Sequence, residues 1–291
     1  MKYQHSHHAG NFADVHKHVS LLAVLDAVTR KETPFLFVDT HAGRGIYQSH
    51  EAAQRDGEAA RGLQRLIAAA AQDAQLTTGA AAPIGTYLQR VAVLRAERRD
   101  ASACPGSPWL AATCLRPIDR AAAFELEAAE HSALRRALEY FPQFSTDQDD
   151  GLKRLRGLLP PRERRAVVLI DPPYENPKDE QRRVLETLVN ALQRFATGVY
   201  MLWFPLKTLR DAEHWQHSLS TLVSRPVLYA QLGLYPLDAR SGLNASGIAI
   251  INPPFRLFEG MAPWLARLHF ALDPDGHGAS QLCMLAARGK N

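Results

Sequence analysis

An acid, two prolines and a tyrosine, Asp171-Pro172-Pro173-Tyr174, directly follow the apolar run 167–170. The run has the β-branched character of a buried parallel strand, and the prolines end it because they cannot donate a hydrogen bond to a neighbouring strand. The carboxylate and the aromatic ring are therefore expected at the carboxyl end of a strand, where open α/β sheets bind ligands. A carboxylate can accept hydrogen bonds from an amine, and an aromatic ring can stack on a planar group that carries this amine. An ordinary strand with a proline turn is the competing interpretation.

A second acid ends another apolar run and opens a glycine-rich turn. Residues 35–38 are apolar, and they are followed by Asp39-Thr40-His41-Ala42-Gly43-Arg44-Gly45. Glycines in such a turn let the backbone approach a nucleotide cofactor closely. The spacing is not GxGxxG, which disfavours a dinucleotide. D-x-x-x-G-x-G resembles instead the loop that binds S-adenosylmethionine in Rossmann-like methyltransferases.

Two further acids follow at positions that suit the same kind of cofactor. The apolar stretch 121–124 runs into Glu125, whose carboxylate would accept hydrogen bonds from both hydroxyls of a ribose. Asp150 and Gly151 open a helix, and an acid there would accept from an adenine amino group. An ordinary helix N-cap is the competing interpretation of Asp150.

The elements that must position these residues alternate along the chain as short apolar runs and amphipathic helices, which is typical of an α/β fold. Strands are expected at 35–38, 121–127, 167–170, 198–204, 227–232 and 247–252. Helices are expected at 13–30, 58–73, 84–98, 109–114, 128–140, 179–196, 208–222 and 261–272. The pattern marks these six strands, and the fold class we expect is a Rossmann-like, mostly parallel sheet of seven strands.

Glu125 lies much farther along the chain from the glycine turn than expected, because the ribose acid of such folds follows its loop by about 20 residues. We therefore expect an inserted helical subdomain at 48–106, within a methyltransferase domain formed by 1–47 and 107–291. Two interpretations of its arginines carry equal weight: a solubilising face, or a surface that follows nucleic-acid phosphates. These arginines are Arg61, Arg65, Arg90, Arg95, Arg98 and Arg99.

Composition limits the classes of protein. The 291 residues are 46% hydrophobic, which is enough for a full core, and the net charge of +4 is compatible with a nucleic-acid partner without establishing one. Three cysteines without a CxxC pair argue against a disulfide framework and a structural zinc site. No apolar run reaches membrane-span length and no signal segment is present, so we expect a cytoplasmic protein that does not bind a membrane. The N-terminal histidines lack the ligand spacing of a metal site, and no metal is expected.

The separated motifs occur in the order of a Rossmann-like N6-adenine or N4-cytosine methyltransferase. The N-terminal segment is more specific and resembles the RlmJ family, which methylates the N6 of an adenine in 23S ribosomal RNA. The resemblance spans nearly the whole chain. It is carried by Tyr3, His5-Ser6, His8-Ala9-Gly10-Asn11, Ala13-Asp14-Val15, Lys17-His18, Asp39-Thr40-His41-Ala42-Gly43, Pro105-Gly106-Ser107-Pro108, Ile170-Asp171-Pro172-Pro173-Tyr174, Arg194-Phe195-Ala196-Thr197-Gly198 and Ala245-Ser246-Gly247.

The resemblance implies the residues of the site. Together with Gly43 of the glycine turn, the residues implied to bind S-adenosylmethionine are His18, His41, Ser107, Glu125, Asp150, Gly151 and Asp171. Those implied in catalysis are Tyr3, His5, Lys17 and Asp171. The first three would form an N-terminal flap over the target base.

The Asp-Pro-Pro-Tyr stretch would hold a flipped-out adenine. Asp171 and the carbonyl of Pro172 would accept the two amine hydrogens, and Tyr174 would stack on the base. The expected partner is 23S ribosomal RNA, free or in an early assembly intermediate, and the expected state is a monomer. Three alternatives stay open: a DNA adenine-N6 methyltransferase, a non-catalytic nucleic-acid-binding module, and a histidine-dependent metal hydrolase.

Overall fold

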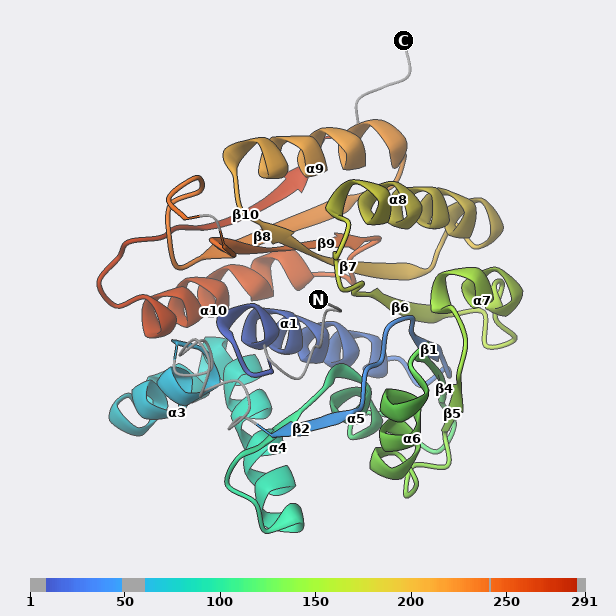
Figure 1. The fold of residues 1–291 in the computed structure, drawn as a ribbon, viewed down its shortest axis with the longest axis horizontal. Helices are drawn as coiled ribbons and strands as arrows, with labels where there is room; N and C mark the ends of the chain where they lie inside the picture. The colour runs from blue at the N-terminus through green and yellow to red at the C-terminus, as the bar shows by residue number, and fades with distance from the viewer. Residues whose placement is uncertain (1–8, 49–60, 241, 287–291) are drawn as a thin grey trace.

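An eight-stranded sheet runs through the centre of the protein (Figure 1). The computed structural model describes residues 9–48, 61–240 and 242–286. The strand order is β10-β8-β9-β7-β6-β1-β4-β5, and the neighbours from β7 to β5 are parallel. The strands are β1 (Leu36–Asp39), β4 (Arg120–Phe124), β5 (Phe144–Asp147), β6 (Ala166–Ile170), β7 (Val199–Leu206), β8 (Val227–Gly233), β9 (Ala245–Ile251) and β10 (Ser280–Leu285).

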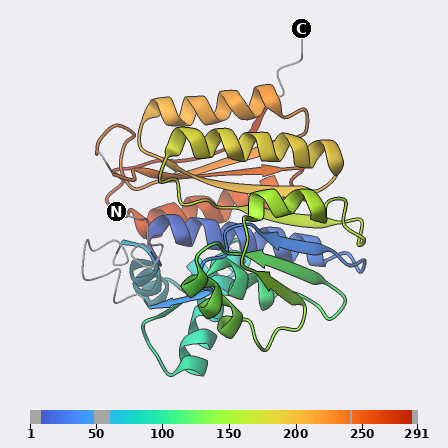
Figure 2. The same ribbon diagram turned by 45° about the vertical axis from the view of Figure 1, so that its right-hand side comes forward.

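Helices cover both faces of this sheet (Figures 1 and 2). One face carries α1 (Phe12–Thr29), α5 (Ser107–Ala112) and α10 (Leu257–Leu272), and the other carries α7 (Gly151–Leu158), α8 (Pro177–Arg194) and α9 (Leu209–Leu222). The remaining helix of this part, α6 (Ala128–Ala137), lies beside β5. The arrangement confirms the predicted Rossmann-like α/β class. The central strands read as continuous apolar runs because helices cover them on both sides.

The first helix, α1, lies in the interior of the molecule. Apart from its last turn it is buried on all sides, between the sheet, α5, α10 and the segment that follows β2. Its polar residues are buried as well, including His16, Lys17 and His18. A buried charge needs a partner, so the position of α1 already points to a polar site beneath it.

The segment predicted as an insertion begins and ends at a small two-stranded sheet. β2 (Ile46–Gln48) and β3 (Ala103–Pro105) pair antiparallel and so bring its two ends together. Between them lie α3 (Leu63–Gln72), the 3-10 turns Ala74–Thr77 and Gly79–Ala81, and α4 (Ala82–Arg98). These helices pack on α1 and α10. The division into separate domains stays a prediction.

The sheet has one strand more than the seven expected. β5 and β10 were not predicted, and neither were β2 and β3. All four are short or lie at sheet edges, and the residues of β5 and β10 are half-buried or exposed. Edge strands of this kind lack the apolar run that marks a central strand, because only part of their surface is covered.

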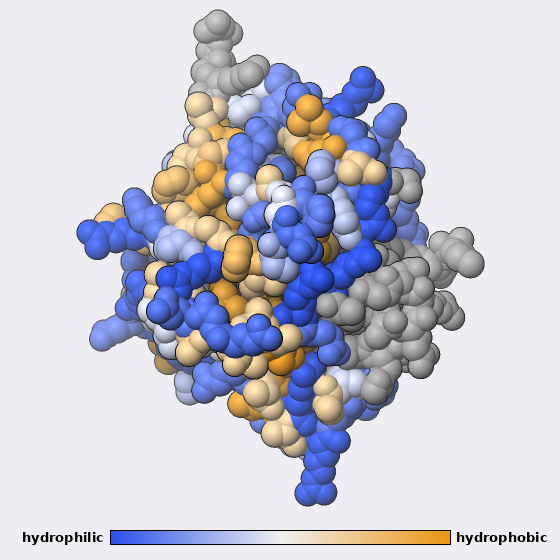
Figure 3. All heavy atoms as spheres, turned by 90° about the vertical axis from the view of Figure 1, so that its left-hand side faces the viewer, coloured by the Kyte–Doolittle hydropathy of each residue, from blue (hydrophilic) through white to orange (hydrophobic). Residues whose placement is uncertain are grey.

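The described helices include none that is long and apolar enough to cross a membrane. On the face drawn in Figure 3, hydrophilic side chains project from the surface, and hydrophobic side chains lie between them in smaller groups.

Candidate active site at the carboxyl edge of the sheet

Asp39 and Asp171 follow neighbouring parallel strands and meet at the same edge of the sheet. Asp39 ends β1, whose register places it beside Leu169 of β6, and Asp171 comes directly after β6. A cavity of about 470 Å³ opens at this edge. Its volume is in the range of a small-molecule site, about 300–1,000 Å³. Of the predicted site residues, those that line it are His41, Gly43, Glu125, Asp150, Gly151, Asp171 and Pro172.

The glycine turn and the acid after β4 are joined directly. The amide of Gly43 donates to Glu125 Oε2 at 3.0 Å, and the amide of Glu127 donates to Oε1 at 2.8 Å. Burial raises the pKa of Glu125, and these two hydrogen bonds oppose that shift. Gly43 has a φ of +59°, and a Cβ there would lie 2.0 Å from the Tyr47 hydroxyl. The turn therefore requires glycine both for its conformation and for space.

Asp150 lines the cavity and also caps α7. Its Oδ1 accepts from the amides of Leu152 and Lys153 at 3.1 and 3.3 Å, and its Oδ2 accepts from Arg183 at 3.0 Å. The N-cap interpretation is thus correct, and it is compatible with a position at the cavity wall. The next residue, Gly151, approaches the backbone of Thr40 so closely that a Cβ would lie 2.2 Å from its carbonyl oxygen.

A buried ammonium links α1 to the Asp-Pro-Pro-Tyr stretch. Lys17 Nζ donates to Asp171 Oδ2 at 2.6 Å and to Asp14 Oδ1 at 2.8 Å. The Lys17 side chain is 3% exposed and that of Asp171 is 6% exposed. Burial alone would lower the pKa of Lys17, but the two carboxylates and their hydrogen bonds raise it above its ordinary value. Lys17 is therefore charged, and it balances one of two buried negative charges.

Asp39 is fully buried and shapes the edge without lining the cavity. Ser107 Oγ donates to its Oδ2 at 2.6 Å, and the His41 amide donates to its Oδ1 at 3.2 Å. Burial raises the pKa of Asp39 to about 6; the Ser107 hydrogen bond opposes this shift and nearby Asp171 adds to it. Burial lowers the pKa of His41 to about 4. His41 is therefore neutral at pH 7 and presents a polar but uncharged ring.

Four predicted residues within the described part of the chain do not line the cavity: Lys17, described above, and Ser107, His18 and Tyr174. Ser107 contacts Asp39 instead, and the His18 ring lies 5.9 Å from the ring of Tyr87 on α4. The Tyr174 side chain is buried, and its hydroxyl donates to the backbone carbonyl of Trp203 at 2.9 Å. The predicted flap residues Tyr3 and His5 lie outside the described residues.

Asp14 is a site residue that the sequence did not single out. Its spacing to Lys17, three positions on one helix, is a signal for a side-chain pair. The same spacing is common on solvated faces, so only the burial of α1 and the contact with Asp171 place the pair beside the candidate site.

A second tetrapeptide, Asn252-Pro253-Pro254-Phe255, resembles Asp171-Pro172-Pro173-Tyr174 in sequence but lies at the opposite edge of the sheet. β9 runs antiparallel to β7, and Ile251 pairs with Tyr200 near the start of β7. Asn252 Nδ2 donates to the carbonyls of Ala196 and Gly198, which precede that strand. Asn252 therefore lies at the other end of the strands from Asp171.

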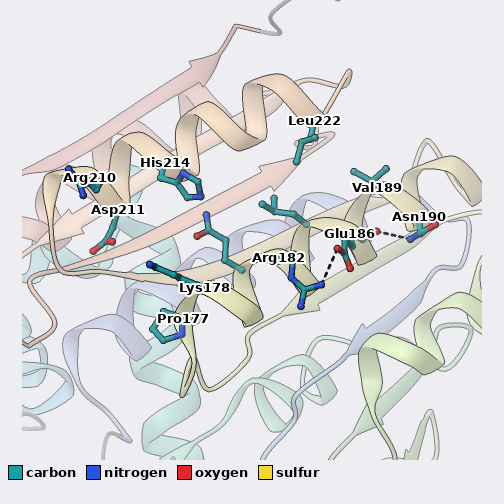
Figure 4. A pocket seen from close by; sticks show the side chains of 12 residues that line it. Pro177, Lys178, Arg182, Glu186, Val189, Asn190, Arg210, Asp211, His214 and Leu222 are labelled. Carbon is teal, nitrogen blue, oxygen red and sulfur yellow. Dashed lines mark hydrogen bonds and ion pairs between the residues drawn. The ribbon is translucent and has the colours of Figure 1, made fainter.

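A larger cavity of about 790 Å³ lies between α8 and α9. Figure 4 shows its lining side chains on the facing sides of the two helices, with Arg182 bonded to Glu186 at 3.4 Å. It lacks a glycine turn and a carboxylate at a strand end. Size alone therefore does not identify the site, and the smaller cavity is the candidate active site because both features occur there.

The family follows from comparison with known proteins. The sequence model of the family described as "Ribosomal RNA large subunit methyltransferase D, RlmJ" matches residues 32–283. The chain belongs to this family. The resemblance to RlmJ and the assignment as a methyltransferase are confirmed.

Two named relatives cover almost the whole chain. Ribosomal RNA large subunit methyltransferase J of Escherichia coli (strain K12) is 36% identical over 279 residues, and that of Haemophilus influenzae is 34% identical over 280 residues. Each comparison covers 96% of both chains. The crystal structure of a Legionella pneumophila protein is 29% identical, with a TM-score of 0.81, and covers 96% of this chain and 98% of that one.

Proposed function

We propose that the protein transfers a methyl group from S-adenosylmethionine to the exocyclic N6 amine of an adenine in large-subunit ribosomal RNA. The observation that carries this proposal is the buried Asp171 carboxylate beside the nucleotide-sized cavity, with Pro172 directly after it. The names of the two relatives support ribosomal RNA as the substrate.

The residues that line the cavity fit S-adenosylmethionine. Glu125 is held by the glycine turn, where a carboxylate would accept from the ribose hydroxyls. Asp149 and Asp150 also line the cavity, and they would receive the adenine end of the cofactor. The cofactor would supply an electrophilic methyl group on its sulfonium sulfur.

Asp171 would orient the acceptor amine. The adenine N6 lone pair is delocalised into the ring, so the site must favour the geometry in which it points at the methyl group. The hydrogen bonds that Asp171 accepts within the described residues go to Oδ2, which leaves Oδ1 for one amine hydrogen. The Pro172 carbonyl would accept the other, and the fixed φ of proline holds the backbone at this turn. Catalysis would then rest chiefly on placement.

Lys17 would set the charge of the site. Its ammonium holds one oxygen of Asp171 and supplies a positive charge beside that carboxylate. A weak base is sufficient, because the amine nitrogen becomes strongly acidic once it is methylated and then gives up one proton to Asp171. Lys17 would also offset part of the unfavourable free energy of burying the Asp14 and Asp171 carboxylates close together.

Transfer of tritium from labelled S-adenosylmethionine tests the proposal. Protein-free large-subunit ribosomal RNA should accept the label, duplex DNA should not, and nuclease digestion should yield N6-methyladenine. Asp171→Asn keeps the shape of the side chain, and we expect it to lower kcat by about 100-fold or more, as for removal of a catalytic group. Calorimetry should show that the variant still binds the cofactor, because Glu125, Asp150 and the glycine turn remain in place.

The matched control is Asp26→Asn on α1, where the carboxylate is 67% exposed and pairs with Arg30. It should transfer at the wild-type rate. Retained turnover in Asp171→Asn would contradict the assignment. Label in duplex DNA would favour the DNA methyltransferase, and RNA binding without transfer would favour the non-catalytic module.

A further inference from the structure

Trp203 lies next to Asp171 at the catalytic edge. Ile170 of β6 pairs with Leu202 of the parallel strand β7, so Asp171 and Trp203 are the next residues along two neighbouring strands. Leu202 and Phe204 are fully buried, whereas Trp203 between them is partly exposed. A large, partly exposed aromatic side chain thus lies within β7, level with the point at which β6 ends.

The indole is held in a fixed orientation from behind. Trp203 Nε1 donates to Ser246 Oγ at 2.9 Å, and the same Oγ lies 3.0 Å from His16 Nδ1. Both Ser246 and His16 are fully buried. An indole can only donate, so the serine hydroxyl accepts from it and keeps its own hydrogen for His16. Three elements, β7, β9 and α1, therefore fix the plane of the ring.

The front of the ring faces the charged part of the site. Lys17 Nζ lies 5.9 Å from the centroid of the indole and 2.6 Å from Asp171 Oδ2. The ring and the carboxylate therefore flank one ammonium group. An adenine whose amine bonds to Asp171 has its own rings within reach of this indole.

Tyr174 is placed differently from Trp203. Its side chain is buried, and its ring meets the indoles of Trp203 and Trp215 edge to face, with centroids 5.9 and 6.3 Å apart. Its hydroxyl donates to the backbone carbonyl of Trp203. Tyr174 also adopts a φ of +51°, in the left-handed region, where non-glycine residues are uncommon. These contacts support Trp203 and leave little of the tyrosine ring for a base.

We infer that Trp203 is the aromatic wall against which the acceptor adenine stacks, and that Tyr174 is a positioning residue behind it. This inference rests on the proposed function. It replaces the stacking role expected for the tyrosine of Asp-Pro-Pro-Tyr. Stacking of a base on an aromatic ring depends little on the RNA sequence but requires an accessible ring. Trp203 is partly exposed and lies at the same edge of the sheet as Asp171.

The test uses an oligoribonucleotide in which 2-aminopurine replaces the adenine that the protein methylates. Its fluorescence should be quenched on binding wild-type protein, because the flipped base stacks on an aromatic ring. Trp203→Leu should abolish the quench and lower kcat/KM for the unsubstituted RNA by about 10-fold or more, the size expected for one lost base stack. Its KM for S-adenosylmethionine should stay unchanged.

Three further variants make the result decisive. Trp203→Phe keeps a smaller ring and should restore most of the quench and of the activity, which a purely structural role in folding would not require. Tyr174→Leu should keep the quench, and Trp264→Phe in the core of α10 controls for the loss of a buried indole. Quenching that persists in Trp203→Leu and is lost in Tyr174→Leu would overturn the inference. Wild-type protein that fails to methylate RNA would instead contradict the proposed function.

Discussion

His16 shows how a buried residue near the site makes the fold sensitive to acid. It is fully buried on α1, and its Nδ1 meets the hydroxyl of Ser246 that also holds Trp203. Burial lowers its pKa to about 3, and the contact with Ser246 only partly opposes the shift. The folded protein therefore holds His16 neutral at any pH at which an unfolded chain would begin to protonate it.

The sign of the resulting pH dependence follows directly. Between about pH 6.5 and pH 3 the unfolded state binds a proton at His16 that the folded state does not, so stability falls as the pH falls. One such proton contributes about 1.4 kcal/mol per pH unit. We expect His16→Gln to make the free energy of unfolding less steep against pH between 6 and 4 by about that amount.

Urea unfolding followed by circular dichroism at several pH values measures this slope. His217→Gln on α9, where the imidazole lies outside the buried core, should leave the slope unchanged. The shifted pKa values of His41 and Asp39 also affect the slope in this range, with signs opposite to each other. The slope of each variant is therefore compared with the slope of the wild-type protein. An unchanged slope in His16→Gln would contradict the assignment of a neutral, buried His16.

The start of α7 shows how one element is fixed against another. Gly151 is the first residue of this helix, and it packs against the backbone of Thr40 after β1. The contact brings the Asp150 cap and the glycine turn to the same cavity. A side chain at this position would meet backbone atoms, which cannot turn aside as a flexible side chain would.

Gly151→Ala should therefore separate α7 from the loop after β1. We expect the Kd for S-adenosylmethionine to rise by about 10-fold or more and the free energy of unfolding to fall by about 1–3 kcal/mol, the range for overpacking. Gly157→Ala on the same helix is the matched control, since a Cβ there meets nothing within 4 Å. That change should stabilise the helix slightly, by about 0.5–1 kcal/mol. Calorimetry and thermal unfolding measure both effects; cofactor affinity in Gly151→Ala equal to wild type would contradict the close approach.

Two arginines join the segment between β2 and β3 to the neighbouring helix α10. Arg65 Nη1 of α3 donates to the carbonyl of Leu272 at 2.9 Å, and Arg267 Nη1 of α10 donates to the carbonyl of Gln75 at 2.7 Å. Arg95 donates to Ala103 within the segment itself. The sequence allowed two interpretations of the arginines in this segment, a solubilising face or a phosphate-binding surface. Arg65 and Arg95 instead make hydrogen bonds that hold the segment in place.

Arg65→Ala should lower the free energy of unfolding by about 1–2 kcal/mol, as for a hydrogen bond from a charged group. Arg98→Ala on α4 is the matched control, because that side chain is exposed. Chemical denaturation compares the two. Equal stability of both variants would show that the bond to Leu272 does not fasten this segment to α10.

The local features of the fold could be predicted from the sequence. The apolar runs before Asp39 and Asp171 became β1 and β6, and the helical periodicities became helices whose ends differ by only a few residues from the expected ones. A buried strand and an amphipathic helix each leave a periodic pattern in a short window, so neighbouring residues suffice to recognise them. The half-buried β5 and β10 left no such pattern.

The sequence by itself determined which chemical groups end the strands: the glycine turn, Glu125 and the Asp171 carboxylate. Only the tertiary structure decided how they act together. Lys17 meets Asp171 across 154 positions of sequence, and Asn252 lies at the far edge because β9 runs antiparallel. The ring of Tyr174 points into the core while that of Trp203 stays open. Contacts between distant segments depend on strand order and packing, which no local pattern records.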